Sequence, residues 1–199
     1  MTIPVSYSKN FINYSREELI NKVSSKMSQK RFQHVLRVEA KACYLADLYH
    51  VDKEQASIAA LTHDYAKERS DEEMISLIHQ ENFDEELLEY GNAIWHGIVG
   101  AFLVNKELEV ADISILEAIE LHTTGAKNMS ELAKVIYVAD YIEDGRDFPV
   151  VNEARKIADH NLDEAVAFET KQTLLYLINN GFKVYPKTIE TYNAWVANN

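Results

Sequence analysis

Apolar residues recur three and four positions apart along most of the chain, and this spacing restricts what the chain can fold into. For example, Val38, Ala42 and Leu45 follow His34 at intervals of four, four and three residues, so all four lie on one face of a helix. Alternation of apolar and polar residues, which would indicate a strand, never lasts beyond a few positions. The 199 residues include only six glycines and three prolines. We therefore predict an all-α fold.

Cap signals divide the chain into individual helices. Ser15 with Glu18, and Ser70 with Glu73, have the form of capping boxes, in which each side chain bonds the other residue's backbone N–H. The predicted helices cover about residues 15–27, 29–49, 52–63, 70–79, 96–104, 112–122, 130–140, 161–181 and 188–195. Because no Ser-, Gly- or Pro-rich linker interrupts them, we expect residues 15–199 to form a single domain, preceded by an N-terminal extension, residues 1–14.

The charge and the cysteine content narrow the class of protein. A net charge of −12 argues against a nucleic-acid partner, since such binding depends on Lys and Arg neutralising phosphates. A small nucleotide remains compatible, because a metal and a few basic residues can reverse the field inside a cleft. Cys43 is the single cysteine, as expected of a core thiol in a reducing compartment. Without a secretory signal or a membrane-spanning run, the sequence predicts a cytoplasmic protein with no membrane partner.

A His-Asp pair ends one of the apolar helices, in the segment AALTHDYAK that covers residues 59–67. Adjacent helical residues point about 100° apart, so His63 and Asp64 can hold one ion together only near a helix end. Further candidate ligands lie on apolar faces or at helix ends: His34, His96, His122 and Asp140. For each histidine taken alone, a hydrogen-bonded core residue is the better interpretation. Asp140 would be costly to bury unpaired, and its alternative partner is Arg146.

Together these six residues offer imidazole nitrogens and carboxylate oxygens without any thiolate. Such a donor set suits iron, manganese, cobalt or zinc. Structural zinc sites favour cysteine ligands and a closed tetrahedron, so the set indicates a catalytic metal rather than a structural one.

At this point the sequence resembles a known family. His34, His63-Asp64 and Asp140, in that order, are similar to the H…HD…D signature of HD-domain metal-dependent phosphohydrolases. The amino-acid sequence around these residues resembles the YqeK branch of the family, whose members are known as symmetrical bis(5'-nucleosyl)-tetraphosphatases. The segments that carry this resemblance are KRFQHVLRVE, HDYAK, WHGIVGA, HTTG and KVIYVADYIEDGR. They extend over roughly residues 28–190, and they imply an HD-domain helical bundle with the metal site between core helices.

The resemblance also implies a role for individual residues. The metal, usually iron in this family, would be held by His34, His63, Asp64 and Asp140. The substrate would contact Asp64, Asp140, Arg31, Tyr65, Ala66, Lys67, His96, His122, Thr123 and Arg146, with Lys183, Val184, Tyr185, Pro186, Lys187 and Thr188 closing over the nucleotide. Asp64, Lys67, His96 and His122 would take part in catalysis. His96 and His122 could instead complete a second metal site, and the sequence does not decide between these roles.

The predicted reaction is symmetrical hydrolysis of diadenosine tetraphosphate, or another dinucleoside tetraphosphate, by a metal-activated water. ADP or GDP would bind as a product-like ligand, and His96 or His122 would protonate the leaving oxygen. The resemblance to this family also implies a homodimer. Two alternatives stay open: an HD phosphohydrolase acting on an alarmone, a cyclic nucleotide or a nucleoside monophosphate, and a nucleotide sensor without catalysis.

Overall fold

The computed structural model describes residues 5–197, and within this range all regular structure is helical. The helices are α1 (Arg16–Ser24), α2 (Gln29–Leu48), α3 (Lys53–Thr62), α4 (Asp71–Gln80), the 3₁₀ turn η1 (Glu85–Glu89), α5 (Asn92–Leu108), α6 (Ile113–Leu121), α7 (Glu131–Ile142), α8 (Val151–Ala158), α9 (Leu162–Asn179) and α10 (Pro186–Trp195). The predicted all-α fold is confirmed. No helix in the described part of the chain combines the length and apolarity needed to cross a membrane.

Helix starts follow the cap signals of the sequence closely. Ser15 and Glu18 form the predicted reciprocal capping box at the start of α1. At six further helices an N-cap side chain accepts a hydrogen bond from the backbone N–H three residues on: Ser28, Asp52, Ser70, Asp112, Ser130 and Asn161. Each such cap satisfies a donor that the helix itself leaves free, and is worth about 1 kcal/mol.

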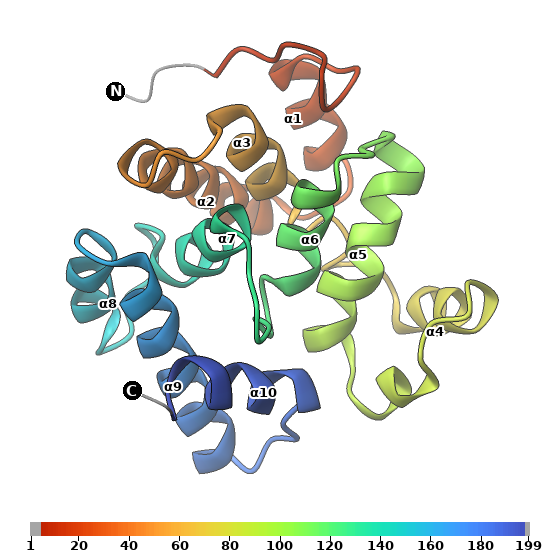
Figure 1. Cartoon of the computed structure of the whole chain (residues 1–199). Helices are drawn as coiled ribbons and strands as arrows, with labels where there is room; N and C mark the ends of the chain where they lie inside the picture. The colour runs from red at the N-terminus through yellow and green to blue at the C-terminus, as the bar shows by residue number, and fades with distance from the viewer. Residues whose placement is uncertain (1–4, 198–199) are drawn as a thin grey trace.

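Five helices pack around a common centre. Helix α2 packs on α3 and α7, and α6 packs on α3, α5 and α7, while α1 covers one end of the molecule and α9 and α10 lie at the other (Figure 1). The apolar faces of these helices make up a continuous core, in which Ile58, Ile119 and Ile136 are fully buried. Burying side chains of this size stabilises the fold by about 1.5–3 kcal/mol each.

Two elements differ from the sequence-based expectation. Helix α5 begins at Asn92, one turn before the predicted start near His96, because Gly91 stands at its N-cap with a φ of 124° and no side chain signals the start. Helix α8 was not predicted, since its buried residues Val151, Ala154 and Ala158 cover less than three turns. Short helices carry a weak periodic signal, so such a segment is read easily as a loop.

The segment before α1 packs on the helical core. Ile12 is buried, and Tyr7 Oη lies 2.8 Å from Ser57 Oγ of α3. Residues 1–4 of the predicted N-terminal extension lie outside the described residues. The division into an extension and a single domain stays a prediction.

Candidate metal centre and substrate cavity

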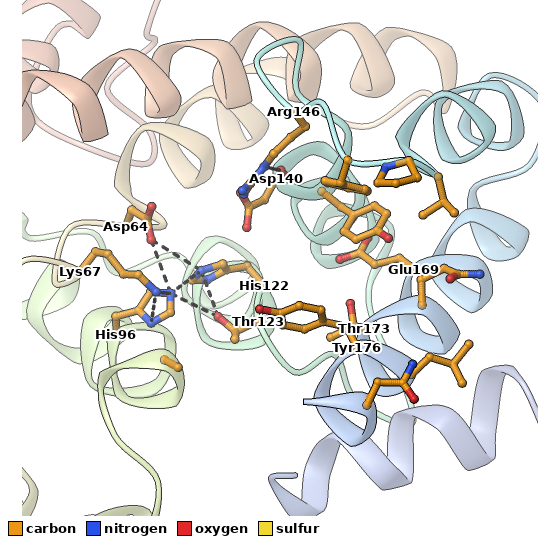
Figure 2. Close-up of a pocket in the computed structure, with 18 of the residues that line it drawn as sticks. Asp64, Lys67, His96, His122, Thr123, Asp140, Arg146, Glu169, Thr173 and Tyr176 are labelled. Carbon is orange, nitrogen blue, oxygen red and sulfur yellow. Dashed lines mark hydrogen bonds and ion pairs between the residues drawn. The ribbon is translucent and has the colours of Figure 1, made fainter. Parts of the chain in front are cut away.

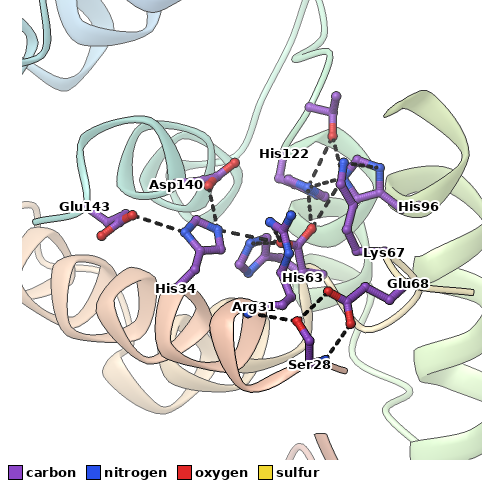
Figure 3. Close-up of polar contacts among 12 residues, drawn as sticks. Ser28, Arg31, His34, His63, Lys67, Glu68, His96, His122, Asp140 and Glu143 are labelled. Carbon is purple, nitrogen blue, oxygen red and sulfur yellow. Dashed lines mark hydrogen bonds and ion pairs between the residues drawn. The ribbon is translucent and has the colours of Figure 1, made fainter. Parts of the chain in front are cut away.

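The six candidate ligands, although far apart in sequence, meet where five helices come together (Figure 3). Helix α2 contributes His34, the end of α3 contributes His63 and Asp64, and single residues come from α5, from the end of α6 and from α7: His96, His122 and Asp140. His63 and His122 are the C-cap residues of their helices. The expected helix-end placement of the His-Asp pair is thereby realised.

Each of the four histidine rings is oriented by a contact through its Nδ1 atom. Three rings use Nδ1–H to donate to the carbonyl three or four residues earlier: His63 to Ala60 (2.7 Å), His122 to Ile119 (2.7 Å) and His96 to Asn92 (2.6 Å). The Nδ1 of His34 lies 3.2 Å from Glu143 Oε1. Because a carbonyl oxygen can only accept, these contacts fix the tautomer and leave Nε2 as the free nitrogen, the usual arrangement behind metal-binding histidines.

The four Nε2 atoms surround the carboxylate of Asp64. They lie 3.6 Å (His34) and 3.4 Å (His63) from its Oδ2, and 3.5 Å (His96) and 4.0 Å (His122) from its Oδ1. The donor atoms form three groups, and within each group all atoms lie within 4.8 Å of one another. Each group combines two of these histidines with Asp64 or Asp140. These spacings suit ligands that converge on one or two ions.

Asp140 closes the centre from the side of α7. Its Oδ1 lies 3.1 Å from His34 Nε2 and accepts a 2.7 Å hydrogen bond from Arg146 Nη2. The alternative reading, a helix-end aspartate paired with Arg146, therefore holds together with the ligand reading, because the same carboxylate faces both groups. Burial would raise the pKa of Asp140, but the neighbouring His34, His63 and Arg146 hold it low, so it is ionised.

The electrostatics of the centre favour ionised carboxylates and neutral rings at His96 and His122. Burial alone would lower the pKa of His63, but the adjacent Asp64 carboxylate raises it. Burial alone would raise the pKa of Asp64, whereas the surrounding histidines hold it well below its usual range. Burial lowers the pKa of His122 to about 4 and that of His96 well below its ordinary value. A neutral imidazole with a free Nε2 is the form that coordinates a metal.

A cavity of about 850 Å³ opens beside the centre, and cationic side chains line its inner end (Figure 2). Arg31 Nη1 lies 2.8 Å from Asp64 Oδ2, and Lys67 Nζ lies 3.3 Å from both ring nitrogens of His96. With Arg146 they bring three cations to this end of a chain that is acidic overall. An anionic ligand bound there would have charge partners on several sides.

The residues of this centre lie within a segment that matches a known protein family. The model of the HD domain matches residues 31–145, which is more than half of the chain and extends from Arg31 through Asp140. The chain belongs to the HD-domain family. The resemblance drawn from the sequence motifs is confirmed.

Relatives and a solved structure of HD proteins cover nearly the whole chain. A "Bis(5'-nucleosyl)-tetraphosphatase, symmetrical" of Bacillus subtilis is 42% identical, covering 92% of this chain and 98% of the relative. The protein of the same name in Staphylococcus aureus is 37% identical over 85% of this chain and 89% of its own length. A crystal structure of a predicted HD superfamily hydrolase involved in NAD metabolism from Clostridium acetobutylicum superposes with a TM-score of 0.88, at 36% identity, covering 94% and 99% of the two chains.

The donor set of this HD domain fits a divalent metal. The Nε2 atoms of His34 and His63 are buried and make no hydrogen bond among the described residues, although both rings are otherwise oriented. A buried nitrogen without a partner costs about 1–3 kcal/mol, and a metal between the two rings and the carboxylates would remove that cost. The residues therefore form a divalent-metal site.

Half of the predicted substrate residues line the cavity, and the other half do not. Lining residues that the sequence predicted are Arg31, Asp64, Lys67, His96, His122, Thr123, Asp140 and Arg146. The side chains of Tyr65 and Ala66 are buried in the core, where Tyr65 Oη donates to Glu107 Oε2. Any contact of these two residues with a substrate is therefore left to their backbone atoms.

Residues 183–188 lie beside the cavity rather than in its lining. Lys183 Nζ pairs with Glu89 Oε2 at 2.9 Å, and Lys187 Nζ pairs with Glu120 Oε1 at 2.9 Å, two residues before His122. The segment thus connects η1 with the end of α6. Its closure over a nucleotide stays a prediction.

Two buried glutamates belong to the site but were not predicted as site residues. The sequence analysis assigned Glu143 no role, yet its side chain is buried and contacts Arg37 and His34. Glu169 lines the cavity from α9, and the sequence reading assigned it no role. A helical periodicity analysis could have placed Glu169 on the buried face, three residues after Val166.

Proposed function

We propose that this protein is a metal-dependent hydrolase that cleaves diadenosine tetraphosphate symmetrically into two ADP. One observation carries the proposal: four oriented histidine Nε2 atoms surround Asp64 at the end of a cavity that also holds three cations. The two similar proteins named symmetrical bis(5'-nucleosyl)-tetraphosphatases support the choice of substrate. The size of the cavity suits a nucleotide, since ligand sites usually enclose about 300–1,000 Å³.

The metal in this proposal is held by His34, His63, Asp64 and Asp140. When bound, a divalent metal lowers the pKa of a coordinated water towards neutrality and so supplies a nucleophile for phosphorus. We propose iron as the ion, with manganese, cobalt and zinc as the other ions that imidazole and carboxylate ligands accept.

His96 and His122 have two roles open to them. Together with Asp64 they form one of the three candidate ligand groups, which supports the proposal of a second ion. Their Nε2 atoms lie 3.0 Å apart, and because Nδ1 of each ring carries the hydrogen that bonds a carbonyl oxygen, both Nε2 lone pairs are left for an ion. The low pKa of both rings argues against a role as the acid, since neither carries an extra proton near neutral pH.

The cations would bind and neutralise the phosphates. Arg31 and Arg146 each pair with a carboxylate of the centre, and each has guanidinium N–H groups left for phosphate oxygens. Burial lowers the pKa of Lys67, which eases transfer of a proton from its Nζ. We assign Lys67 as the donor to the leaving oxygen, in place of the two histidines.

The balance of the reaction is simple. The oxygen of water forms a bond to an inner phosphorus, and the bond from that phosphorus to the central bridging oxygen breaks. The bridging oxygen leaves as the terminal oxygen of the second ADP and takes up a proton from Lys67, whose Nζ recovers the proton that the water releases. No side chain of the protein needs to bond covalently to phosphorus.

Chromatography of nucleotides after incubation with diadenosine tetraphosphate tests the proposal. Protein reconstituted with Fe(II) or Mn(II) is expected to give ADP as the sole product, while Asp64→Ala should give none and should retain no metal. Asp47→Ala, which removes an exposed aspartate at the end of α2, serves as the matched control. ATP and AMP as products, or turnover by metal-loaded Asp64→Ala, would contradict the proposal. Tight nucleotide binding without turnover by any metal form would favour a sensor.

A further inference from the structure

The cavity extends well past the metal centre, along a wall formed by the end of α7, the following loop and α9 (Figure 2). Tyr141, Phe148, Glu169, Thr173 and Tyr176 are among the residues of this wall, and the mechanism above uses none of them. In Figure 2, Glu169, Thr173 and Tyr176 stand across the cavity from Lys67 and His96. We refer to these five residues as the α9 wall.

The carboxyl group of Glu169 is the ionisable carboxyl group of this wall, and one of its oxygens lacks a hydrogen-bond partner among the described residues. Its residue is 6% exposed, and its Oε2 atom makes no hydrogen bond to any described residue. Burial, together with the nearby Asp140 carboxylate, raises the pKa of Glu169 well above its usual range, so the group is held in its neutral form. A buried polar atom without a hydrogen bond calls for a partner, and a ligand in the cavity that Glu169 lines could supply one.

Aromatic rings supply the apolar part of the α9 wall. The rings of Tyr141 and Phe148 lie 4.8 Å apart between centroids, inclined by 56°. Tyr176 is 59% exposed, and the neighbouring Leu175, which also lines the cavity, is 45% exposed. Large apolar side chains gathered at the edge of a cavity offer flat faces on which a nucleobase can stack.

We propose that the α9 wall is the subsite for the second nucleoside of the substrate, with its base against Phe148 and Tyr176 and its polar edge bonded to Glu169. This inference rests on the proposed function, in which the phosphate chain carries a nucleoside at each end. Residues 183–188, the segment expected to close over a nucleotide, lie outside the lining of this cavity. The three cations occupy the metal end, and the α9 wall supplies the aromatic and polar groups that a nucleoside requires.

The neutral carboxyl group also sets a preference among bases. It presents one donor and one acceptor side by side, which matches the ring nitrogen and the amino group of adenine. Guanine presents two adjacent donors at its N1 and N2 positions, which an ionised carboxylate would match instead. Adenine is therefore the base expected at this subsite.

Titration calorimetry with ADP and the Mn(II)-loaded protein tests the subsite without relying on turnover. Two ADP molecules should bind per chain, one at each half of the cavity. Tyr176→Ala and Phe148→Ala should each weaken one of the two binding events roughly tenfold, the size of effect that removal of a stacking side chain produces. Ile178→Ala, which truncates an equally exposed apolar residue of α9 outside the cavity lining, should leave both events unchanged.

Glu169 variants separate recognition from packing. Glutamine keeps one donor and one acceptor, so Glu169→Gln should bind the second ADP like the original protein, whereas Glu169→Leu should weaken it at least severalfold. A single ADP per chain, or two events that the aromatic variants leave intact, would overturn the subsite. Two ADP molecules bound by a protein that never cleaves diadenosine tetraphosphate would refute the proposed function and leave the subsite standing.

Discussion

Glu143 is expected to control metal affinity although it does not reach the metal. Its buried carboxylate lies 3.2 Å from His34 Nδ1 and also bonds Arg37 and the backbone N–H of Gly145. Through the contact with Nδ1 it fixes the tautomer and the orientation of the ring. Loss of such an outer partner typically weakens metal binding 10- to 100-fold, which corresponds to about 1.4–2.7 kcal/mol.

The test is competition for Co(II) or Mn(II) between the protein and a chromophoric chelator. Glu143→Ala should bind the metal about 10- to 100-fold more weakly, and Glu143→Gln should lose less, because its amide oxygen still accepts from Nδ1–H. Asp144→Ala is the matched control, since the side chain of Asp144 is next to Glu143 in sequence, is 74% exposed and pairs with Lys41. Metal binding by Glu143→Ala that is as tight as in the original protein would refute the reasoning, provided that circular dichroism shows an intact fold.

Three further outcomes follow from the structure. Arg146→Ala should retain the metal, because removal of the cation leaves Asp140 free as a ligand. The variant should have a higher KM or a lower kcat than the original protein. Loss of the metal from this variant would contradict the role of Arg146 in binding phosphate. Gly97→Ala should destabilise the metal-free protein by about 1–3 kcal/mol in a urea titration, since the new Cβ would lie 2.9 Å from the carbonyl oxygen of Glu120; equal stability would show that α5 can shift away from α6. Glu169 has a higher pKa in the folded protein than in the unfolded chain, where its pKa is near 4.5. The stability that its neutral carboxyl group contributes is therefore fully present below pH 4.5, and it is lost as pH rises through the pKa of the folded protein. As pH rises above 4.5, Glu169→Gln should therefore gain stability relative to the original protein, by at most about 1.4 kcal/mol for each pH unit. A difference in Tm between the two proteins that does not change with pH would contradict the neutral carboxyl group.

Helix positions could be read from the sequence because their signals are local. Caps such as Ser130 and Asn161 satisfy backbone donors within one turn, and an apolar stripe repeats every three or four residues. Helix α5 was placed late because Gly91 offers no side chain as a cap. Local reasoning of this kind works for whichever helices carry both signals.

The clustering of histidines and aspartates at this centre could also be anticipated, for a different reason. A histidine or an aspartate on an apolar helix face has few explanations, so His63-Asp64 and Asp140 drew attention by their chemistry. Glu143 carries no such signal, because glutamate is common on helix surfaces and its burial depends on how the end of α7 packs. For Glu169 the only signal was its helical spacing from the apolar Val166. The role of a partner that acts through another residue becomes visible only when the three-dimensional contacts are known.

The central claim is that water attacks an inner phosphorus of diadenosine tetraphosphate at the His-Asp centre. Mass spectrometry of products formed in ¹⁸O-labelled water tests this claim most directly. The account predicts that ADP is the only nucleotide product and that one of the two ADP molecules from each substrate carries a single ¹⁸O on its β-phosphate. Label in AMP or ATP, or unlabelled products, would contradict it.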